Sequence, residues 1–342
     1  MKKIGIFGTT GYAGLQLISL LNRHQSIEIT FAASNRYANE KLSSIYRQFK
    51  GELDLTLVST EKAYAQVSSV DLVFLALPHT ISMTIAKKIM TLNKDVKIVD
   101  LSGDFRFNDY KIYEEYYDTK HILKDFLKKY TYGLPEIYRE KIKKSQYVAN
   151  PGCYPTSAIL PLYPLIKENI ISKSHIIIDS KSGLSGTGRK ENINFLFTES
   201  VNNVYAYNTG SHRHQPEIKD HLYNADILFS PHIVPSVRGI FSTIYCQLEE
   251  SITADIINAT FKKYYEEEFF IRLDTNIPKV NQVQRTNYCD ISYTIDSKNK
   301  KLILYSCIDN LMKGAASQAI QNMNLMLGIN EKESIDNNLF YL

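Results

Sequence analysis

One cysteine, Cys153, stands in a setting that suits a nucleophile. It lies in the stretch "ANPGCYPT", after an apolar run, between two prolines, and at the start of a predicted helix that runs towards Glu168. A thiol at a helix N-terminus meets the positive end of the helix dipole, which favours the thiolate. A lone cysteine is more often a buried structural residue, and that interpretation fits Cys246 and Cys307, which lie in strand-like runs. The frame around Cys153 favours covalent catalysis.

A nucleophilic thiol needs a partner for proton transfer, and His212 and His214 are the candidates. Both lie in "NTGSHRHQPEIKDHL", before a helix predicted to start at Pro216–Glu217, so we expect them on a loop. A solvated polar loop explains either histidine taken alone equally well. The pair becomes a candidate only together with a nucleophile elsewhere in the chain.

Two polar segments resemble anion clamps. "DLSGDFR" ends in Arg106, just beyond a strand predicted over Val96–Asp100, and "SKSGLSGTGRK" places several glycines and hydroxyls before Arg189. Flexible backbone amides together with a guanidinium suit a phosphate or carboxylate. The second segment could equally be a plain flexible loop. Two arginines that each close a polar loop after a strand nevertheless indicate a substrate with anionic ends.

A glycine-rich turn follows the first predicted strand. Gly8, Gly11 and Gly14 in "GIFGTTGYAGLQLISLL" let the backbone turn tightly and approach a pyrophosphate at a helix N-terminus. The spacing G-x-x-G-x-x-G is looser than the usual dinucleotide fingerprint, and a tight turn without a ligand is the alternative. A strand before the turn and an amphipathic helix after it favour a dinucleotide site.

The end of the second predicted strand indicates which dinucleotide binds. NAD sites usually have an acidic residue there for the ribose 2′-hydroxyl, but no carboxylate occurs before Glu40. Ser34 and Arg36 suit a 2′-phosphate instead, although a surface arginine in a loop would look the same. We therefore expect NADP(H) rather than NAD.

These groups must be positioned by two different kinds of sheet. The first half alternates short apolar runs with helical patterns, which is typical of a parallel sheet covered by helices. The second half has longer, alternating strand patterns that indicate a mixed or antiparallel sheet. The fold class is thus an α/β Rossmann-type NADP-binding domain plus an α+β catalytic domain. We predict that residues 1–150 with 309–342 form the first and 151–308 the second.

The predicted elements can be given by residue range. Strands are expected at 3–7, 27–33, 70–77, 96–100, 147–149, 174–180, 227–234, 237–248, 287–295 and 301–308. Helices are expected at about 11–23, 81–92, 153–168, 216–224, 252–265 and 310–327.

The composition excludes several classes of protein. The 342 residues are 44% hydrophobic and 22% charged, and a net charge of +4 is spread along the chain, so nothing indicates nucleic-acid binding. The longest apolar stretches are too short to span a membrane, so a soluble cytoplasmic protein is expected. Four cysteines show neither the density of a disulfide scaffold nor the paired spacing of a zinc site, so no metal is expected.

With these residues in place, the chain resembles the N-acetyl-γ-glutamyl-phosphate reductase family of the aspartate-semialdehyde dehydrogenase superfamily. The matching segments occur in family order along almost the whole chain, and together they are far more specific than any one alone. Asn35-Arg36 stands where the family often has two basic residues. The segments are "GTTGYAG", "DLSGDFR", "YGLPE", "NPGCYPT", "SGLSGTGR", "HRHQPEI", "PHIVPSVRGI" and "NLMKGAASQAIQNMN".

The resemblance implies an enzyme of arginine biosynthesis that uses NADPH to reduce an acyl phosphate to N-acetyl-L-glutamate 5-semialdehyde. Cys153 would attack the acyl phosphate and hold a thioester, and His214, with His212 close behind, would transfer the proton. The resemblance also implies a homo-oligomer, a homodimer or homotetramer, acting on a small molecule without nucleic acid or membrane.

Further site residues follow from the same resemblance. The substrate and its phosphate are expected to contact Arg106, Ser182, Gly183, Arg189, Glu217 and Arg238. The cofactor is expected to contact Gly8, Thr10, Gly11, Tyr12, Gly14, Ser34, Arg36, Pro78 and Ser102, with Asn310 and Gly314 approaching the nicotinamide from the returning helix.

Two alternatives to this function stay open at the level of sequence. A close relative could reduce an aminoadipyl or glutamyl phosphate held by an acidic carrier protein, and the net charge does not decide between free and carrier-bound substrates. A regulator that senses NADP without catalysis is a remote alternative, because it would have little need for Cys153, His214 and both anion clamps together.

Overall fold

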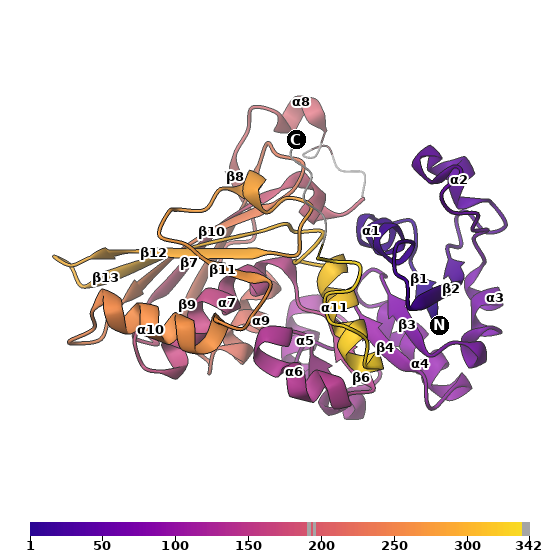
Figure 1. The fold of residues 1–342 in the computed structure, drawn as a ribbon, viewed down its shortest axis with the longest axis horizontal. Helices are drawn as coiled ribbons and strands as arrows, with labels where there is room; N and C mark the ends of the chain where they lie inside the picture. Colours follow the sequence, from indigo (N-terminus) through magenta and orange to yellow (C-terminus); the bar gives the residue numbers. More distant parts are fainter. Residues whose placement is uncertain (190–192, 194–195, 337–342) are drawn as a thin grey trace. The chain divides into compact units, whose positions relative to one another are not determined.

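The computed structural model describes residues 1–189, 193 and 196–336 (Figure 1). They form two compact units. The first contains Met1–Pro151 and the segment that starts at Ala315, and the second contains Gly152–Gly314. The predicted domain segment 309–342 ends in residues 337–342, which lie outside the described part of the chain.

The first unit contains a six-stranded sheet in the order β2-β1-β3-β4-β6-β5. Every neighbouring pair is parallel, and most of these strand residues are buried, as expected for strands covered on both faces. The predicted α/β class is confirmed. The strands are β1 (Lys2–Phe7), β2 (Ile27–Ala33), β3 (Leu72–Leu75), β4 (Lys97–Asp100), β5 (Tyr130–Tyr132) and β6 (Tyr147–Ala149).

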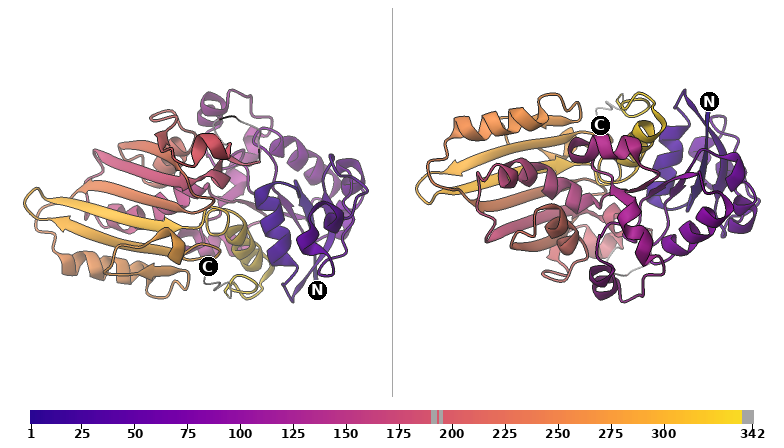
Figure 2. Two further views of the ribbon diagram at one scale, coloured as in Figure 1. Left: turned by 90° about the horizontal axis from the view of Figure 1, so that it is seen from above. Right: turned by 90° about the horizontal axis from the view of Figure 1, so that it is seen from below.

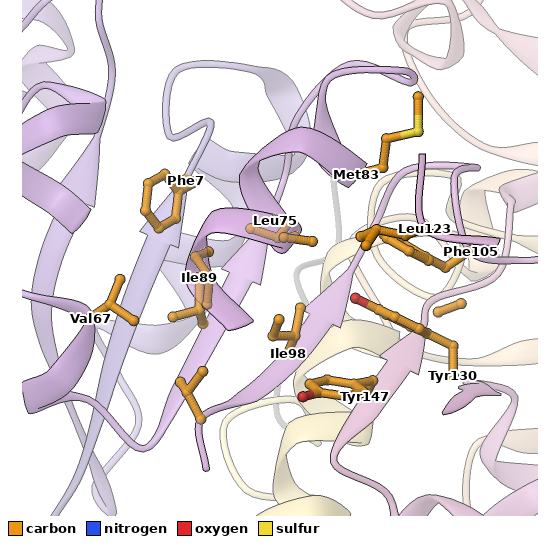
Figure 3. Packing of buried hydrophobic residues seen from close by; sticks show 14 of the residues in the cluster. Phe7, Val67, Leu75, Met83, Ile89, Ile98, Phe105, Leu123, Tyr130 and Tyr147 are labelled. Atoms are coloured by element: carbon orange, nitrogen blue, oxygen red, sulfur yellow. The ribbon is translucent and has the colours of Figure 1, made fainter. Parts of the chain in front are cut away.

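Helices cover both faces of this sheet. On one face, a buried cluster joins Phe7, Leu75 and Ile98 of the strands to residues of α3, α4 and α5, such as Ile89 (Figure 3). Helix α11 contacts both α1 and α6, and none of the three contributes a residue to that cluster, so they cover the opposite face. The helices are α1 (Tyr12–Leu21), α2 (Leu42–Ile45), α3 (Thr60–Tyr64), α4 (Ser82–Leu92), α5 (Tyr110–Tyr117), α6 (Pro135–Lys144) and α11 (Ala316–Leu327).

The strand order reverses between β1 and β3. From β1 the chain moves to one side to form β2, and then crosses back to build β3 and β4 on the other side. In open parallel sheets, the carboxyl ends of the strands at such a switch point are where ligands bind. The loops that follow β1, β3 and β4 therefore form the expected ligand-binding edge of this unit.

The second unit contains a seven-stranded mixed sheet in the order β11-β12-β13-β10-β7-β9-β8, and its long strands lie side by side in both views of Figure 2. The longer strands alternate buried and more exposed residues, as a sheet with one covered face requires. The strands are β7 (Ile176–Gly183), β8 (Tyr205–Ala206), β9 (Ile227–Val234), β10 (Ile240–Gln247), β11 (Ile271–Leu273), β12 (Cys289–Asp296) and β13 (Lys301–Ile308).

The covered face of this second sheet carries helix α7. It contacts β10, β13 and the flanking helices α9 and α10. The helices are α7 (Cys153–Lys167), α8 (Phe197–Ser200), α9 (His214–His221) and α10 (Ala254–Tyr265), and short 3-10 turns include η1 (Arg47–Phe49), η2 (Val67–Ser69), η3 (Lys124–Lys129), η4 (Leu184–Thr187) and η6 (Val280–Gln282).

Two helix starts near the candidate site residues differ from the predicted ones. The last helix begins at Ala316 rather than Asn310. The Asp309 carboxylate accepts the amides of Leu311 and Met312 and closes a turn, but Ala315, with φ −157° and ψ −89°, is not helical and separates this turn from the helix. Helix α9 begins at His214 rather than Pro216, since a proline in the first turn costs no helical hydrogen bond. His214 is therefore a helix residue and not a loop residue.

Among the described residues, none of the helices has the length and apolar character that a bilayer span requires.

Candidate active site

Cys153 is the first residue of α7, as the sequence predicted. Gly152 before it is extended, with φ −68° and ψ 156°, and Thr156 Oγ1 donates to the Gly152 carbonyl at 2.9 Å. Cys153 is partly exposed, whereas the other three cysteines are buried. Burial raises the pKa of Cys246 to about 12, which keeps that thiol protonated. Of the four cysteines, Cys153 alone combines partial exposure with a position at a helix start, which suits a nucleophile.

Glu217 connects the first turns of α7 and α9. Its side chain is fully buried, and Oε1 accepts the amide of Gly152 at 2.8 Å. Glu217 lies three residues after His214, so this bond holds the turn before Cys153 against the helix that His214 opens. The predicted contact of Glu217 with substrate stays a prediction, and the structure adds this backbone contact to it.

His212 and His214 lie together beside the residue that follows Cys153. Their ring centroids are 4.8 Å apart, and the ring of Tyr154 stands edge-on to both, at 5.7 Å and 5.8 Å. His212 Nδ1 accepts the amide of His214 at 3.1 Å, which places the proton of a neutral His212 on Nε2. The two histidines therefore differ in what they can do.

Burial separates His212 from His214 further. The His212 ring packs against the rings of Tyr207 and Phe229 as well as Tyr154. Desolvation, with a smaller contribution from the charge of Arg213, lowers the pKa of His212 to about 4. His212 is thus neutral at physiological pH, while His214 is half-buried at the helix start.

A chain of tyrosines supports these rings. The Tyr207 hydroxyl donates to the Tyr154 hydroxyl at 3.2 Å, and Tyr154 donates to the carbonyl of His232 at 3.3 Å. The sequence analysis missed both tyrosines. Tyr154 was inside the quoted cysteine motif, whereas nothing in the sequence around Tyr207 distinguishes it from the other tyrosines.

The glycine-rich segment after β7 pairs with the segment before β10. The amides of Leu184 and Ser185 donate to the carbonyls of Ser236 and Val237. A side chain on Gly183 would meet the backbone of Arg238 at 2.7 Å, so the close approach requires glycine. Of the predicted substrate residues, Ser182, Gly183 and Arg238 are therefore brought together, and Arg189 lies on the exposed end of the segment.

Arg238 is held by a carboxylate that the sequence analysis missed. Its Nε lies 2.8 Å from the fully buried Asp309, which also accepts the amide of Arg285. Next to it, Asn310 accepts the amide of Gly239 at 2.6 Å and donates to Ser185 Oγ at 2.9 Å. The Asn310 amide, predicted to approach the nicotinamide, thus holds this loop.

Gly314 borders the nucleophile. A Cβ at this position would lie 2.7 Å from Cys153 Cβ and 2.7 Å from the carbonyl of Asn310. The absence of a side chain at Gly314 therefore keeps space beside Cys153.

The glycine turn of the first unit has the predicted geometry for close backbone approach. Gly8 has a φ of +85°, and a Cβ there would overlap the carbonyl of Ala76 after β3. Gly14 is buried, and its Cβ would lie 2.7 Å from the carbonyl of Thr9. Gly11 is the N-cap of α1, and Tyr12 is its first residue and is exposed.

The end of β2 meets this turn. Thr10 Oγ1 lies 3.3 Å from Ser34 Oγ, and the Tyr46 hydroxyl donates to the Thr10 carbonyl at 3.2 Å. Arg36 is exposed, with its guanidinium 5.3 Å from the ring centroid of Tyr37. Thr10 and Ser34 thus lie together at the end of β2, and Arg36 lies two residues further along the chain. Their contact with the cofactor stays a prediction.

The loops after β3 and β4 hold the remaining predicted residues of this unit. Pro78 is exposed. Ser102 is buried, and its hydroxyl donates to Asp100 at 2.7 Å, so this side chain supports the loop from inside. Arg106 Nε donates to the carbonyl of Asn150 at 2.8 Å, which fixes the guanidinium at the ends of two strands.

Comparisons with known proteins identify the family of this chain. Residues 3–145 match the family described as "Semialdehyde dehydrogenase, NAD binding domain", and residues 153–310 match "Semialdehyde dehydrogenase, dimerisation domain". Proteins named N-acetyl-gamma-glutamyl-phosphate reductase from Clostridium novyi and Alkaliphilus metalliredigens are 42% and 45% identical to this chain. The first alignment covers 98% of both chains and the second 97%. This chain belongs to the N-acetyl-γ-glutamyl-phosphate reductase family.

Solved structures place the family within a wider fold. An aspartate semialdehyde dehydrogenase from Vibrio cholerae is 17% identical, with a TM-score of 0.73 over 96% of this chain and 98% of its own. The aspartate semialdehyde dehydrogenase from Candida albicans is 16% identical, with a TM-score of 0.72 over 96% and 99%. As a member of the N-acetyl-γ-glutamyl-phosphate reductase family, the chain is an oxidoreductase of the acyl-phosphate reductase type.

The burial of His212 leads to a prediction about stability. Between pH 6.5 and about 4 the unfolded chain binds a proton at His212 that the folded chain does not, so this residue's contribution to stability falls as the pH decreases. The full loss is about 3 kcal/mol. His212→Asn, whose Oδ1 can replace Nδ1 as acceptor, should remove this dependence.

The measurement compares urea unfolding of wild type and His212→Asn at several pH values. The comparison is needed because Asp100, whose pKa burial raises to about 7, gains stability on acidification over the same interval. Parallel pH profiles of the two proteins would contradict a buried neutral His212.

Proposed function

We propose that this chain catalyses the NADPH-dependent reduction of N-acetyl-L-glutamyl 5-phosphate to N-acetyl-L-glutamate 5-semialdehyde and phosphate. The relatives that share 40–45% of its residues over nearly the full length are named for this reaction. The observation in the structure that carries the proposal is Cys153, a partly exposed thiol at a helix start that Glu217 ties to the helix of His214. Nearly full-length agreement with these relatives does not favour a carrier-bound substrate or a non-catalytic regulator.

The chemistry follows from the thiol and the imidazole. The Cys153 thiolate attacks the acyl carbon, and the bond from that carbon to the phosphate oxygen breaks, which leaves a thioester and free phosphate. NADPH, when bound, supplies the hydride that reduces the acyl carbon. The aldehyde then forms as the carbon–sulfur bond breaks, and His214 provides the proton that the departing thiolate takes up.

Several polar groups are proposed to bind the substrate. Arg106 would bind the phosphate, because a guanidinium matches phosphate oxygens with paired hydrogen bonds. Ser182, Gly183 and Arg189 would contact the rest of the substrate. Arg238 would act there mainly through its backbone, since Asp309 neutralises its guanidinium.

The residues around the glycine turn fit NADP(H). Gly8 and Gly14 let the turn pack closely on the backbone of Ala76 and Thr9, and this tight turn would bring a pyrophosphate to the amides at the start of α1. The hydroxyls of Thr10 and Ser34, with Arg36, would hold the 2′-phosphate. We assign cofactor binding to residues 1–150 with 309–342 and catalysis to 151–308.

The test of the function is an assay of the reverse reaction with purified protein. N-acetyl-L-glutamate 5-semialdehyde and NADP should give NADPH only when inorganic phosphate is present. Absence of NADPH formation, with a carrier-bound substrate turned over instead, would contradict the free acyl phosphate as substrate.

Arg36→Ala tests the choice of cofactor. The variant should weaken NADPH binding by about tenfold or more, because a charge-assisted contact to the 2′-phosphate is lost, while NADH binding stays nearly unchanged. Fluorescence titration of both nucleotides measures the two affinities. Equal losses for NADPH and NADH would show that Arg36 does not contact the 2′-phosphate.

A homo-oligomer, either a dimer or a tetramer, is proposed on the basis of the second unit. Its residues 153–310 match a dimerisation domain. Strands β7, β9 and β10 of its sheet carry Ile177, Leu228 and Tyr245, which are 42%, 50% and 40% exposed. Such apolar side chains on a sheet suit contact with a second copy, and sedimentation velocity gives the oligomer number. A cytoplasmic location stays a prediction from the sequence.

A further inference from the structure

A buried carboxylate, Asp104, joins the two loops at the ligand-binding edge of the first unit. Asp104 lies in the loop after β4 and is fully buried. Its Oδ1 accepts the amide of Thr80 at 2.8 Å, and its Oδ2 accepts the amide of Met83 at 3.0 Å. Both amides belong to the start of α4 and the loop before it. The Asp104 side chain, which follows β4, therefore caps α4, the helix that follows the neighbouring strand β3.

A third donor reaches Asp104 from α5. The Tyr113 hydroxyl donates to Oδ1 at 3.1 Å, and the Tyr113 ring is itself fully buried. The backbone carbonyl of Asp104 lies 2.8 Å from His121 Nε2, whose other ring nitrogen accepts the amide of Leu123. Side-chain and backbone groups of Asp104 are thus both engaged.

A second contact joins the same two loops. His79 Nδ1, in the loop after β3, accepts the amide of Gly103 at 2.7 Å. Thr80 next to it has a φ of +72°, a conformation that a residue with a side chain adopts only when its surroundings impose it. In this conformation the Thr80 amide donates to Asp104.

The loop after β4 also holds Arg106. The guanidinium donates to the carbonyl of Leu101 at 2.7 Å through Nη2 and to the carbonyl of Asn150 through Nε. Only one residue separates Arg106 from Asp104. The direction of the Arg106 side chain therefore depends on the backbone conformation of this loop, which the contacts of Asp104 fix.

We propose that Asp104 is a positioning residue. It fixes the loops after β3 and β4 relative to each other and thereby orients Arg106 for the phosphate of the substrate. The inference rests on the proposed function, in which Arg106 binds that phosphate. A buried carboxylate is costly unless its hydrogen bonds are complete. The three donors and the strained Thr80 show that Asp104 imposes a conformation that apolar packing alone would not select.

Three variants test the proposal. Asp104→Asn replaces one acceptor oxygen by a donor that faces a backbone amide, and Tyr113→Phe removes a single donor. Tyr116→Phe is the matched control, because it removes a hydroxyl from the same helix that does not bond to Asp104. The KM for phosphate in semialdehyde oxidation should rise about tenfold in Asp104→Asn and about threefold in Tyr113→Phe. It should be unchanged in Tyr116→Phe, and the affinity for NADP should be unchanged in all three.

A readout without turnover accompanies the kinetics. Phosphate should raise the unfolding temperature of wild type and Tyr116→Phe, and by less in Asp104→Asn and Tyr113→Phe. If kcat falls with the amount of folded protein while the KM for phosphate stays at the wild-type value, Asp104 is only structural and the proposal is wrong. If Asp104→Asn does not fold, an unchanged KM in Tyr113→Phe overturns the proposal by itself.

The two readouts distinguish failure of this proposal from failure of the proposed function. A wild-type protein without phosphate-dependent NADP reduction would contradict the function, whatever the variants do. Wild-type activity together with equal KM values for phosphate in all variants would contradict the role of Asp104 alone.

Discussion

Replacing Cys153 with serine is expected to abolish phosphate-dependent oxidation of N-acetyl-L-glutamate 5-semialdehyde. The hydroxyl is a far weaker nucleophile than the thiolate and would not form the thioester, so kcat should fall by about four orders of magnitude or more. Affinity for NADP should stay nearly intact, because Gly8, Gly14 and the end of β2 belong to the other compact unit. Initial rates and fluorescence titration measure the two quantities.

Cys289→Ser is the matched control for this variant. Cys289 is buried, and its Sγ lies 3.5 Å from Ser306 Oγ, so a serine hydroxyl there would keep a polar partner. The control should retain wild-type kcat. Substantial turnover in Cys153→Ser, above the rate with boiled enzyme, would rule out the thioester.

His214→Asn is expected to lower kcat by about 10²-fold to 10⁴-fold, the range for loss of a general acid or base. His212→Asn should have a much smaller effect. The reason is that His212 is buried and neutral and uses Nδ1 as an acceptor for the His214 amide, a role that asparagine can fill. His214 opens α9, and Glu217 holds this helix to the residue before Cys153.

The pH profile of kcat separates these roles. Loss of His214 should remove one limb of the profile, because the group that exchanges the proton is gone. His212→Asn should keep both limbs. The opposite pattern, with a collapse of kcat in His212→Asn and near-normal rates in His214→Asn, would assign the proton to His212.

The sequence alone predicted much of the first unit, and the reason is physical. Short runs of apolar residues and the intervening helical periodicity are local patterns, and a parallel sheet covered by helices is their usual outcome. The predicted strand 27–33 is β2. Gly8 and Gly14 were predictable because only glycine tolerates the positive φ and the backbone contacts of that turn.

Element boundaries were predicted less well where contacts with distant residues decide them. The last helix was expected from Asn310, since its small and apolar residues continue the helical pattern. Asp309 instead binds Arg238 and closes a turn with the next amides, and the non-helical Ala315 separates that turn from the helix that begins at Ala316. Helical periodicity carries no information about such a carboxylate.

By itself the sequence determined which residue types are present and their local spacing: a thiol at a helix start, two histidines separated by one residue, and a glycine turn after a strand. The tertiary structure decided how residues of the same type differ in burial, charge state and hydrogen-bond partners. It made His212 neutral by burying it among aromatic rings, placed the Glu217 carboxylate on the Gly152 amide, and gave Asp104 its three donors. Burial and hydrogen-bond partners come from segments far apart along the chain, so local sequence patterns do not encode them.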